Sequence, residues 1–99
     1  MAKSADEKRG KILEVAKRRF AHYGLAKTTM SEIAKDLAFS KALLYYYFPD
    51  KNSLFIAVIE EIIDEMEVDM LKLLTKDLSV EERVFEFLET RIESLRKYF

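Results

Sequence analysis

Three consecutive tyrosines, Tyr45, Tyr46 and Tyr47, stand in the segment S-K-A-L-L-Y-Y-Y-F-P-D-K at positions 40–51. Successive residues on a helix are about 100° apart around its axis, so a small core cannot bury all three rings. Leu44 and Phe48 lie at i, i+4 and would point inward, which directs Tyr46 outward. A phenol ring packs on a sugar or a thymine methyl group while its hydroxyl bonds a phosphate oxygen, which suits the wall of a nucleic-acid groove. The alternative is that Tyr45 or Tyr47 packs on a neighbouring helix.

Basic and hydroxyl side chains near these tyrosines could serve the same chemistry. Lys41, at the N-terminal end of the same predicted helix, is the best candidate for a base-edge contact, with guanine O6 and N7 as its usual partners. Thr29 and Ser40 are predicted N-caps of helices whose free N–H groups would face a backbone phosphate. Lys27 could reach the flanking DNA backbone. A further basic set is predicted to form an arm towards the minor groove: Lys8, Arg9 and Lys11.

The sequence contains few residues that are arranged for catalysis. His22 is the only histidine, and we interpret it as structural because a cation in the last turn of a helix suits the helix dipole. The carboxylate pairs at 61/65 and 60/64 could ligate a metal, but without a Glu-x-x-His partner they indicate a solvated helix face. The chain has no cysteine, no nucleophile motif and no glycine-rich phosphate loop. We therefore predict no enzyme activity, no catalytic residues, no metal and no cofactor.

Composition and charge limit the class of protein. The 99 residues are 49% hydrophobic and 35% charged, with only two glycines and one proline, which is typical of a single all-helical domain. No run approaches the ~18 apolar residues of a membrane span, and the N-terminus has no export signal, so we expect a cytoplasmic protein with no membrane partner.

The charge is distributed unevenly along the chain. Residues 1–51 hold eleven Lys/Arg against six Asp/Glu, a balance of +5, while residues 52–99 hold six against twelve, a balance of −6. This asymmetry indicates that the N-terminal half meets a polyanion. The alternative is that helix surfaces are simply charged and that such a skew arises by chance.

Capping signals and apolar spacing predict five helices. The predicted N-caps and helices are Ser4 for 5–23, Thr29 for 30–37, Ser40 for 41–48, Asp50 for 51–74 and Ser79 for 80–99. Ser4, Thr29 and Ser79 are each followed three residues later by glutamate, which makes a capping box. Gly24 would end the first helix in the left-handed conformation, and Pro49 would end the third.

The two C-terminal helices carry long apolar stripes. Large apolar residues recur at i, i+3, i+4 spacing through 51–74 and again through 80–99, ending at Phe99. Three short N-terminal helices cannot cover so much apolar surface. We therefore expect these faces to pair with each other and a second chain, or to associate non-specifically. The final letters L-R-K-Y-F carry no C-cap signal, which suggests a chain cut within a helix; the alternative is a natural frayed end.

Helices 30–37 and 41–48 are joined so tightly that they must cross steeply, which is the geometry of a helix-turn-helix. An apolar frame supports this interpretation: Ile33, Ala34, Leu37, Phe39, Leu44 and Phe48. Ala38 occupies the turn position that usually carries glycine, and a left-handed alanine there would cost about 1 kcal/mol. Short paired helices also occur in bundles that do not bind DNA.

The string G-L-A-K-T-T-M-S-E-I-A-K-D-L-A-F-S-K-A-L-L-Y-Y-Y-F-P-D-K-N-S-L-F strongly resembles the DNA-binding domain of the TetR-type transcriptional repressor family. The resemblance begins in K-I-L-E-V-A-K-R-R-F-A-H-Y-G and extends to about Ile59. It implies an all-α fold in which a three-helix DNA-binding domain, residues 1–50, precedes helices four and five of an all-α ligand and dimerisation domain, residues 51–99. The sequence departs from the family pattern at Ala38 and Ala42, commonly glycine, and at Leu43, commonly a threonine that touches DNA.

The resemblance implies that the third helix reads DNA. The implied DNA-binding residues are Thr29, Ser40, Lys41, Ala42, Leu43, Tyr45, Tyr46, Tyr47 and Lys51. Tyr45 and Tyr47 would contact phosphates, Tyr46 would lie nearer the bases, and Lys51 would hold a phosphate.

The function implied is a sequence-specific transcriptional regulator, a ligand-responsive repressor that binds a palindromic operator as a homodimer. Its expected partners are double-stranded DNA, a second copy of the chain and a small-molecule effector that shifts helix four and releases the DNA. The alternative is a helical protein-interaction module that keeps the fold without binding DNA. The charge asymmetry and the outward tyrosines weigh against that alternative.

Overall fold

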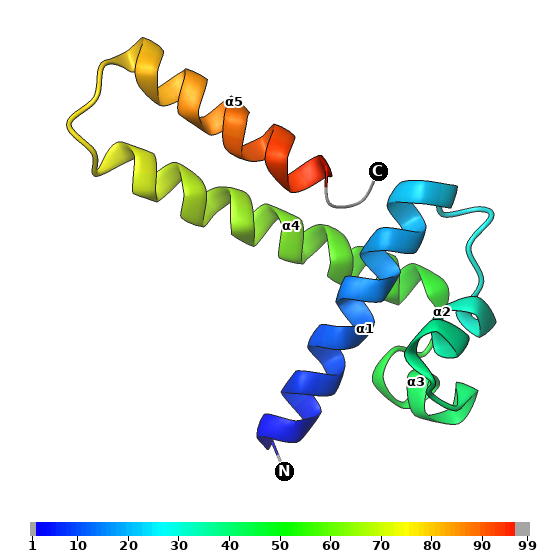
Figure 1. Cartoon of the computed structure of the whole chain (residues 1–99). Coiled ribbons are helices and arrows are strands. Elements are labelled where there is room, and N and C mark those ends of the chain that lie inside the picture. Colours follow the sequence, from blue (N-terminus) through cyan, green and yellow to red (C-terminus); the bar gives the residue numbers. More distant parts are fainter. Residues whose placement is uncertain (1, 97–99) are drawn as a thin grey trace. The chain divides into compact units, whose positions relative to one another are not determined.

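The computed structural model describes residues 2–96 and, over that range, contains five α-helices and no strand (Figure 1). The helices are α1 (Ala2–Tyr23), α2 (Met30–Leu37), α3 (Lys41–Tyr47), α4 (Lys51–Leu74) and α5 (Val80–Arg96). The predicted all-α class is confirmed. The chain divides into two packed units, a first unit up to Ile59 and a second unit from Glu60 onward. The beginning of α4 therefore belongs to the same unit as α1, α2 and α3.

Most helix boundaries follow the predicted caps. The side chains of four N-caps accept a backbone N–H three residues along: Thr29 from Glu32 at 3.1 Å, Ser40 from Leu43 at 3.1 Å, Asp50 from Ser53 at 2.7 Å and Ser79 from Glu82 at 3.2 Å. Gly24 ends α1 with φ of +86° and donates its N–H to the Phe20 carbonyl at 2.9 Å. Pro49 follows the C-cap residue Phe48 at the end of α3.

The predicted start of the first helix was wrong. α1 already includes Ala2, so Ser4 lies inside the helix instead of capping it. Alanine and lysine are strong helix formers, and an exposed serine in a helix costs less than about 0.7 kcal/mol relative to alanine. The local capping signal at Ser4 is therefore too weak to stop the helix from extending towards the N-terminus.

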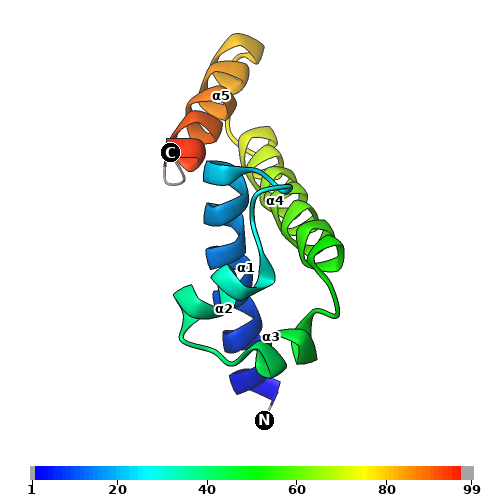
Figure 2. The same cartoon turned by 90° about the vertical axis from the view of Figure 1, so that its right-hand side faces the viewer.

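The core of the first unit is built from one face of each of its helices. Its buried apolar residues are Ile12, Leu13, Ala16, Phe20, Met30, Ile33, Ala34, Leu44, Phe48, Leu54, Ala57 and Val58. α2 packs against α1, and α3 lies next to α2 (Figure 2). The rings of Phe20 and Phe55 meet edge-to-face with centroids 5.3 Å apart, which fastens the start of α4 to α1.

The turn between α2 and α3 has the predicted left-handed residue. Ala38 has φ of +57° and ψ of +33°, which is strained for any residue with a Cβ. The Phe39 N–H donates to the Ala34 carbonyl at 2.9 Å, and the Ala38 N–H donates to the Lys35 carbonyl at 3.1 Å. These bonds satisfy carbonyls at the C-terminal end of α2 and hold the strained residue in place.

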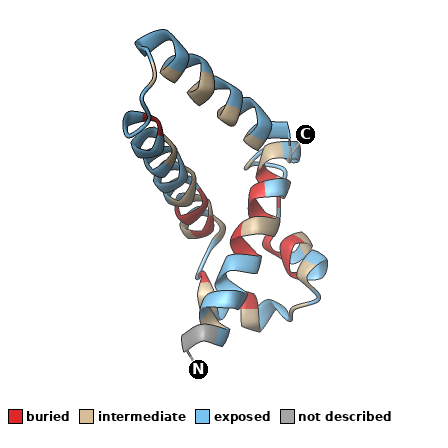
Figure 3. Cartoon of the chain, turned by 60° about the vertical axis from the view of Figure 1, so that its left-hand side comes forward, coloured by how far each residue is buried: buried red, intermediate tan, exposed pale blue. Residues whose placement is uncertain are grey.

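The second unit buries much less. Leu73 is its one buried residue among those described, and α5 has none (Figure 3). Asp69 of α4 forms an ion pair with Arg91 of α5, and Lys76, in the connection between the two helices, forms one with Glu86 of α5. An open apolar groove of about 530 Å³ is lined by Ile63, Met66, Glu67, Met70, Leu71 and Phe87. The predicted excess of uncovered apolar surface is thus confirmed for the described residues, whereas Phe99 lies outside them.

None of the helices within residues 2–96 combines the length and the apolar character needed to cross a membrane.

Candidate nucleic-acid interface

The outward face of α3 is the candidate interface. Leu44 is fully buried and Phe48 is 5% exposed, whereas Tyr46 is 82% exposed. The predicted rotation of α3 is therefore confirmed. Tyr45 is exposed and Tyr47 is half-buried, and the rings of Tyr46 and Tyr47 meet edge-to-face with centroids 5.3 Å apart. The ring of Tyr46 gains little from the core, so its aromatic surface and its hydroxyl are available to a partner.

The N-terminal turn of α3 adds basic, hydroxyl and apolar groups to this face. Lys41 and Ala42 are exposed and Leu43 is half-buried. The Ser40 Oγ accepts a hydrogen bond from the Leu43 N–H, so its own O–H can still donate to a phosphate oxygen. Ala42 and Leu43 present methyl groups, which can contact a thymine methyl group but cannot donate a hydrogen bond.

Lys51, at the start of α4, is half-buried and has an acceptor within the protein. Its Nζ donates to the Leu25 carbonyl, in the connection between α1 and α2, at 2.8 Å. An ammonium group carries three protons, so the bond to Leu25 leaves others for a second acceptor. The lysine predicted to hold a phosphate therefore also ties the start of α4 to the segment that follows α1.

The N-terminal basic residues do not form an extended arm. Lys8, Arg9 and Lys11 are exposed residues of α1. Any approach to the minor groove would therefore be made by side chains of a helix, and it stays a prediction. The Arg9 guanidinium lies 5.3 Å from the ring centroid of Phe48, a cation–π contact between α1 and the end of α3. Lys27 is exposed in the connection between α1 and α2.

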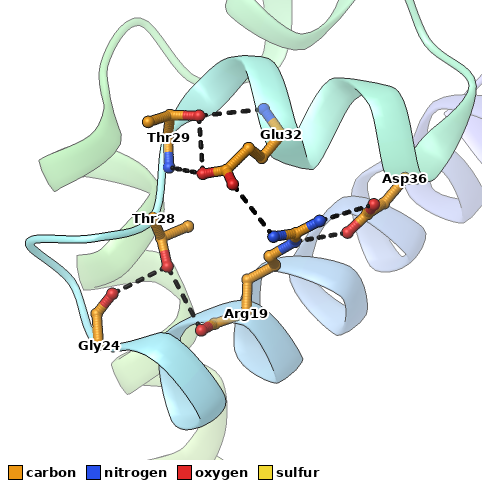
Figure 4. A network of polar contacts seen from close by, with 6 residues as sticks. All are labelled: Arg19, Gly24, Thr28, Thr29, Glu32 and Asp36. Atoms are coloured by element: carbon orange, nitrogen blue, oxygen red, sulfur yellow. Dashed lines mark hydrogen bonds and ion pairs between the residues drawn. The ribbon is translucent and has the colours of Figure 1, made fainter.

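A network of polar contacts centred on Arg19 joins α1 to α2 (Figure 4). Its Nε and Nη2 donate to the two carboxylate oxygens of Asp36 at 2.6 and 2.9 Å, and its Nη1 donates to Glu32 at 3.3 Å. The same guanidinium lies 5.2 Å from the ring centroid of Tyr23, one turn further along α1. Every nitrogen of the Arg19 guanidinium thus has a carboxylate partner on α2.

Two threonines fasten the connection that leads into α2. The hydroxyl of Thr28, which is fully buried, lies 2.8 Å from the Gly24 carbonyl and 3.3 Å from that of Arg19. Thr29 donates both its N–H, at 3.0 Å, and its hydroxyl, at 2.9 Å, to Glu32. The Thr29 hydroxyl therefore already has an acceptor in the capping box.

The charges of this network support one another. The bond from Arg19 lowers the pKa of Asp36, and the bonds from Thr29 lower the pKa of Glu32, in each case because they stabilise the carboxylate. The bond to Asp36 in turn raises the pKa of Arg19. All three groups are therefore charged at neutral pH.

The chemistry that the described residues offer is hydrogen bonding, charge and aromatic contact. His22 is exposed in the last turn of α1, where its ring meets that of Tyr23 edge-to-face with centroids 4.5 Å apart. Between residues 2 and 96, no cluster of three or more His, Cys, Asp or Glu side chains is arranged to hold a metal ion.

Three contacts around the site were not predicted from the sequence: those of Arg19 with α2, of Lys51 with Leu25, and of Arg9 with Phe48. The only available signal was the spacing of Glu32 and Asp36, which lie four residues apart and so share one face of α2. A carboxylate pair on the face that packs against another helix indicates a cation on that helix.

Known proteins resemble the part of the chain that carries this site. Residues 12–58 match the family described as bacterial regulatory proteins, tetR family. The match runs from α1 through α3 and into the part of α4 that belongs to the first unit. Both helices of the helix-turn-helix and all nine predicted site residues lie inside it.

Individual relatives extend the similarity further along the chain. The HTH-type transcriptional regulator RutR of Escherichia coli is 31% identical over 97 residues, which cover 98% of this chain and 45% of RutR. The HTH-type transcriptional repressor Rv1474c of Mycobacterium tuberculosis is 31% identical over 94 residues, or 91% of this chain and 50% of that protein. The HTH-type transcriptional regulator AcrR of Shigella flexneri is 41% identical over 51 residues, or 52% of this chain and 24% of AcrR. The chain thus spans about half the length of the first of these curated relatives.

Proposed function

We propose, from the premise that this chain belongs to the TetR family of bacterial regulatory proteins, that its first unit binds duplex DNA through α3 and that the protein regulates transcription. The outward surface of α3 carries this proposal. Tyr46 is 82% exposed on a helix whose opposite side is buried, so most of its aromatic surface is open to a partner. A catalytic role is not proposed, because this family is one of DNA-binding regulators.

The proposed contacts divide into base reading and phosphate binding. Lys41 would donate to a guanine edge, Tyr46 would lie against the bases, and Ala42 and Leu43 would contact thymine methyl groups. The remaining residues would hold the backbone: Thr29, Ser40, Tyr45, Tyr47 and Lys51. Phosphate contacts of this kind orient the protein on the duplex, while base contacts give it sequence preference.

For the whole protein we propose a cytoplasmic, ligand-responsive repressor that binds a palindromic operator as a homodimer. Residues 51–99 would begin its regulatory domain, with a small-molecule effector binding among its helices. The apolar groove between Met66, Met70 and Phe87 supports an apolar effector, because it offers concave, largely apolar surface. The name of the M. tuberculosis relative, a transcriptional repressor, supports repression over activation.

Two lysines provide the test of DNA binding. Fluorescence anisotropy with random and selected duplexes, over a range of salt concentrations, should show salt-dependent binding by the parent chain. Lys51→Ala should weaken binding to all duplexes alike and reduce the salt slope by about one unit, since a phosphate contact is lost. Lys41→Ala should instead flatten the preference at one or two base pairs, at a cost of ~1–3 kcal/mol on the selected site.

The alternative function, a helical protein-interaction module that does not bind DNA, predicts a different outcome. The parent chain would then bind no duplex at any salt concentration. A site selection with Lys41→Ala that returned the parent consensus would leave DNA binding intact but remove Lys41 from base reading.

A further inference from the structure

We propose, building on the proposed binding of DNA by α3, that Arg19 is a positioning residue. By holding Glu32 and Asp36 of α2 against α1, Arg19 sets the angle at which α3 meets the duplex. Arg19 acts through α2 and needs no contact with DNA of its own.

Apolar packing alone does not define the orientation of α2. This helix buries Met30, Ile33 and Ala34, but apolar contacts are non-directional and permit small rotations. The guanidinium of Arg19 is planar and its donors point in fixed directions. It donates twice to Asp36, at 2.6 and 2.9 Å, and once to Glu32, at 3.3 Å. Two points of α2, one turn apart, are thereby held by one rigid group, which restricts both the rotation and the tilt of the helix.

α3 must follow any movement of α2 because the joint between them is short and hydrogen-bonded. Ala38 takes the left-handed conformation, and the Phe39 N–H donates to the Ala34 carbonyl at 2.9 Å. A change in the tilt of α2 is therefore carried into α3 and to the tyrosines on its outward face.

The neighbouring arginine provides a matched control. The Arg19 side chain is 22% exposed and is bonded to another helix, whereas Arg18 is 57% exposed and forms an ion pair at 3.4 Å with Glu14 of its own helix. Arg18→Gln and Arg19→Gln remove the same charge from adjacent positions of α1. A difference between them in DNA affinity therefore cannot come from net charge.

Asp36→Asn distinguishes a positioning role from a simple effect of charge, because the two predict opposite changes in DNA affinity. Removal of a negative charge should by itself strengthen binding to DNA, whereas loss of a partner of Arg19 should weaken it. We expect Arg19→Gln and Asp36→Asn each to weaken affinity about tenfold, the loss of roughly one charge-assisted phosphate contact. The double variant should bind no more weakly than either single variant, because both remove one interaction.

Two further variants complete the affinity series. Arg18→Gln should stay within about twofold of the parent, and Arg19→Lys should be intermediate, since it keeps the charge but loses the fork of donors. Affinity is measured at a temperature where circular dichroism shows the parent helix content in every variant. If Arg19→Gln loses helix content, the DNA affinities of Arg19→Lys and Asp36→Asn are compared with that of the parent instead. Asp36→Asn that bound DNA as tightly as the parent, or more tightly, would overturn the proposal.

A second readout is independent of DNA. The chain has no cysteine, so Lys11→Cys on α1 and Ala42→Cys on α3 give a unique pair for spin labels, and electron paramagnetic resonance reports their distance. Arg19→Gln and Asp36→Asn should shift or broaden the distance distribution, while Arg18→Gln should leave it unchanged. Unchanged distances in both test variants would refute the role of Arg19 even if the parent binds DNA. A parent that bound no duplex would refute the proposed function instead, and the distances would still decide whether Arg19 positions α3.

Discussion

The two units of this chain differ in how completely they bury their apolar residues. In the first unit Ile33, Leu44 and Leu54 are fully buried, whereas in the second unit Val80 and Phe85 remain 69% and 64% exposed. The first unit therefore closes a core from its own helices. The second unit, the later part of α4 together with α5, presents apolar surface that only additional chain or a partner can cover.

The two units also differ in how completely their arginine side chains are hydrogen-bonded. Arg19, in the first unit, donates from Nε, Nη1 and Nη2 to carboxylates of α2. In the second unit the Nε atoms of Arg83 and Arg91 are buried without a hydrogen-bond partner. A buried donor without a partner costs about 1–3 kcal/mol. The guanidinium donors of Arg19 in the first unit are thus satisfied by acceptors of that unit, whereas those two donors of the second unit are not.

The largest expected effect is the loss of a core ring from the first unit. Phe48→Ala should destabilise it by ~3–5 kcal/mol through the lost burial and the cavity that remains. Phe85→Ala, a matched change at an exposed position of α5, should change stability by less than about 0.5 kcal/mol. Denaturant unfolding followed by circular dichroism measures both. Equal destabilisation by the two variants would show that the second unit has a core of its own.

The exposed faces of α4 and α5 should make the chain associate. At high micromolar concentration, sedimentation should give a mass about twice that of the monomer or more, accompanied by binding of a hydrophobic dye. Phe85→Glu combined with Leu88→Glu, both on exposed positions of α5, should reduce the association and leave the melting of the first unit unchanged. A monomer without bound dye at that concentration would contradict this prediction.

A smaller effect separates folding from recognition within α3. Tyr46→Ala should leave stability within about 0.5 kcal/mol, because the ring is exposed. DNA affinity should fall as both the ring contact and the hydroxyl are lost, while Tyr46→Phe isolates the hydroxyl, with a cost of roughly 0.5–1.5 kcal/mol. Thermal melting and anisotropy on the same samples make the comparison. A collapse of the melt with affinity per folded molecule retained would mean that Tyr46 supports the fold instead of the interface.

Local signals in the sequence were sufficient for most of the fold. The caps at Thr29, Ser40 and Asp50 each depend on a residue only three positions away, and the rotation of α3 follows from the spacing of Leu44 and Phe48. Helical periodicity therefore predicts which ring faces outward. The start of α1 was missed because helix propensity there outweighs a single serine.

The contacts that the sequence did not reveal connect residues far apart in the chain. Arg19 lies 13 residues from Glu32 and 17 from Asp36, and Lys51 lies 26 residues from Leu25. Whether such pairs meet depends on the angle between helices, and apolar periodicity leaves that angle undefined within a range of packing geometries. Most of the residues expected to touch DNA could thus be placed on or next to α3 from the sequence, whereas the residues that hold α3 in position could not.

The smallest expected effect is a loss of stability in acid that originates in the first unit. The carboxylates of Glu32, Asp36 and Asp50 have pKa values below their usual 4.5, 3.8 and 3.8, because hydrogen bonds from Thr29, Arg19 and Ser53, respectively, stabilise the charged forms. A carboxyl group whose pKa is lower in the folded state stabilises the fold above its unfolded-state pKa and loses that contribution as pH falls through the folded-state value. The melting temperature of the first unit should therefore fall as pH decreases from about 5 to below 3.8.

The variant Asp36→Asn should make this pH dependence shallower. At neutral pH it should lower the free energy of unfolding by at most about 1 kcal/mol, since the ion pair is partly screened by solvent. Melting curves at a series of pH values, for the parent and for Asp36→Asn, measure both effects. If melting temperature depended on pH equally in the parent and in Asp36→Asn, the bond between Arg19 and Asp36 would contribute nothing to the acid sensitivity. If the melting temperature of the parent rose on acidification, the stabilising effect assigned to the three ionised carboxylates would be wrong.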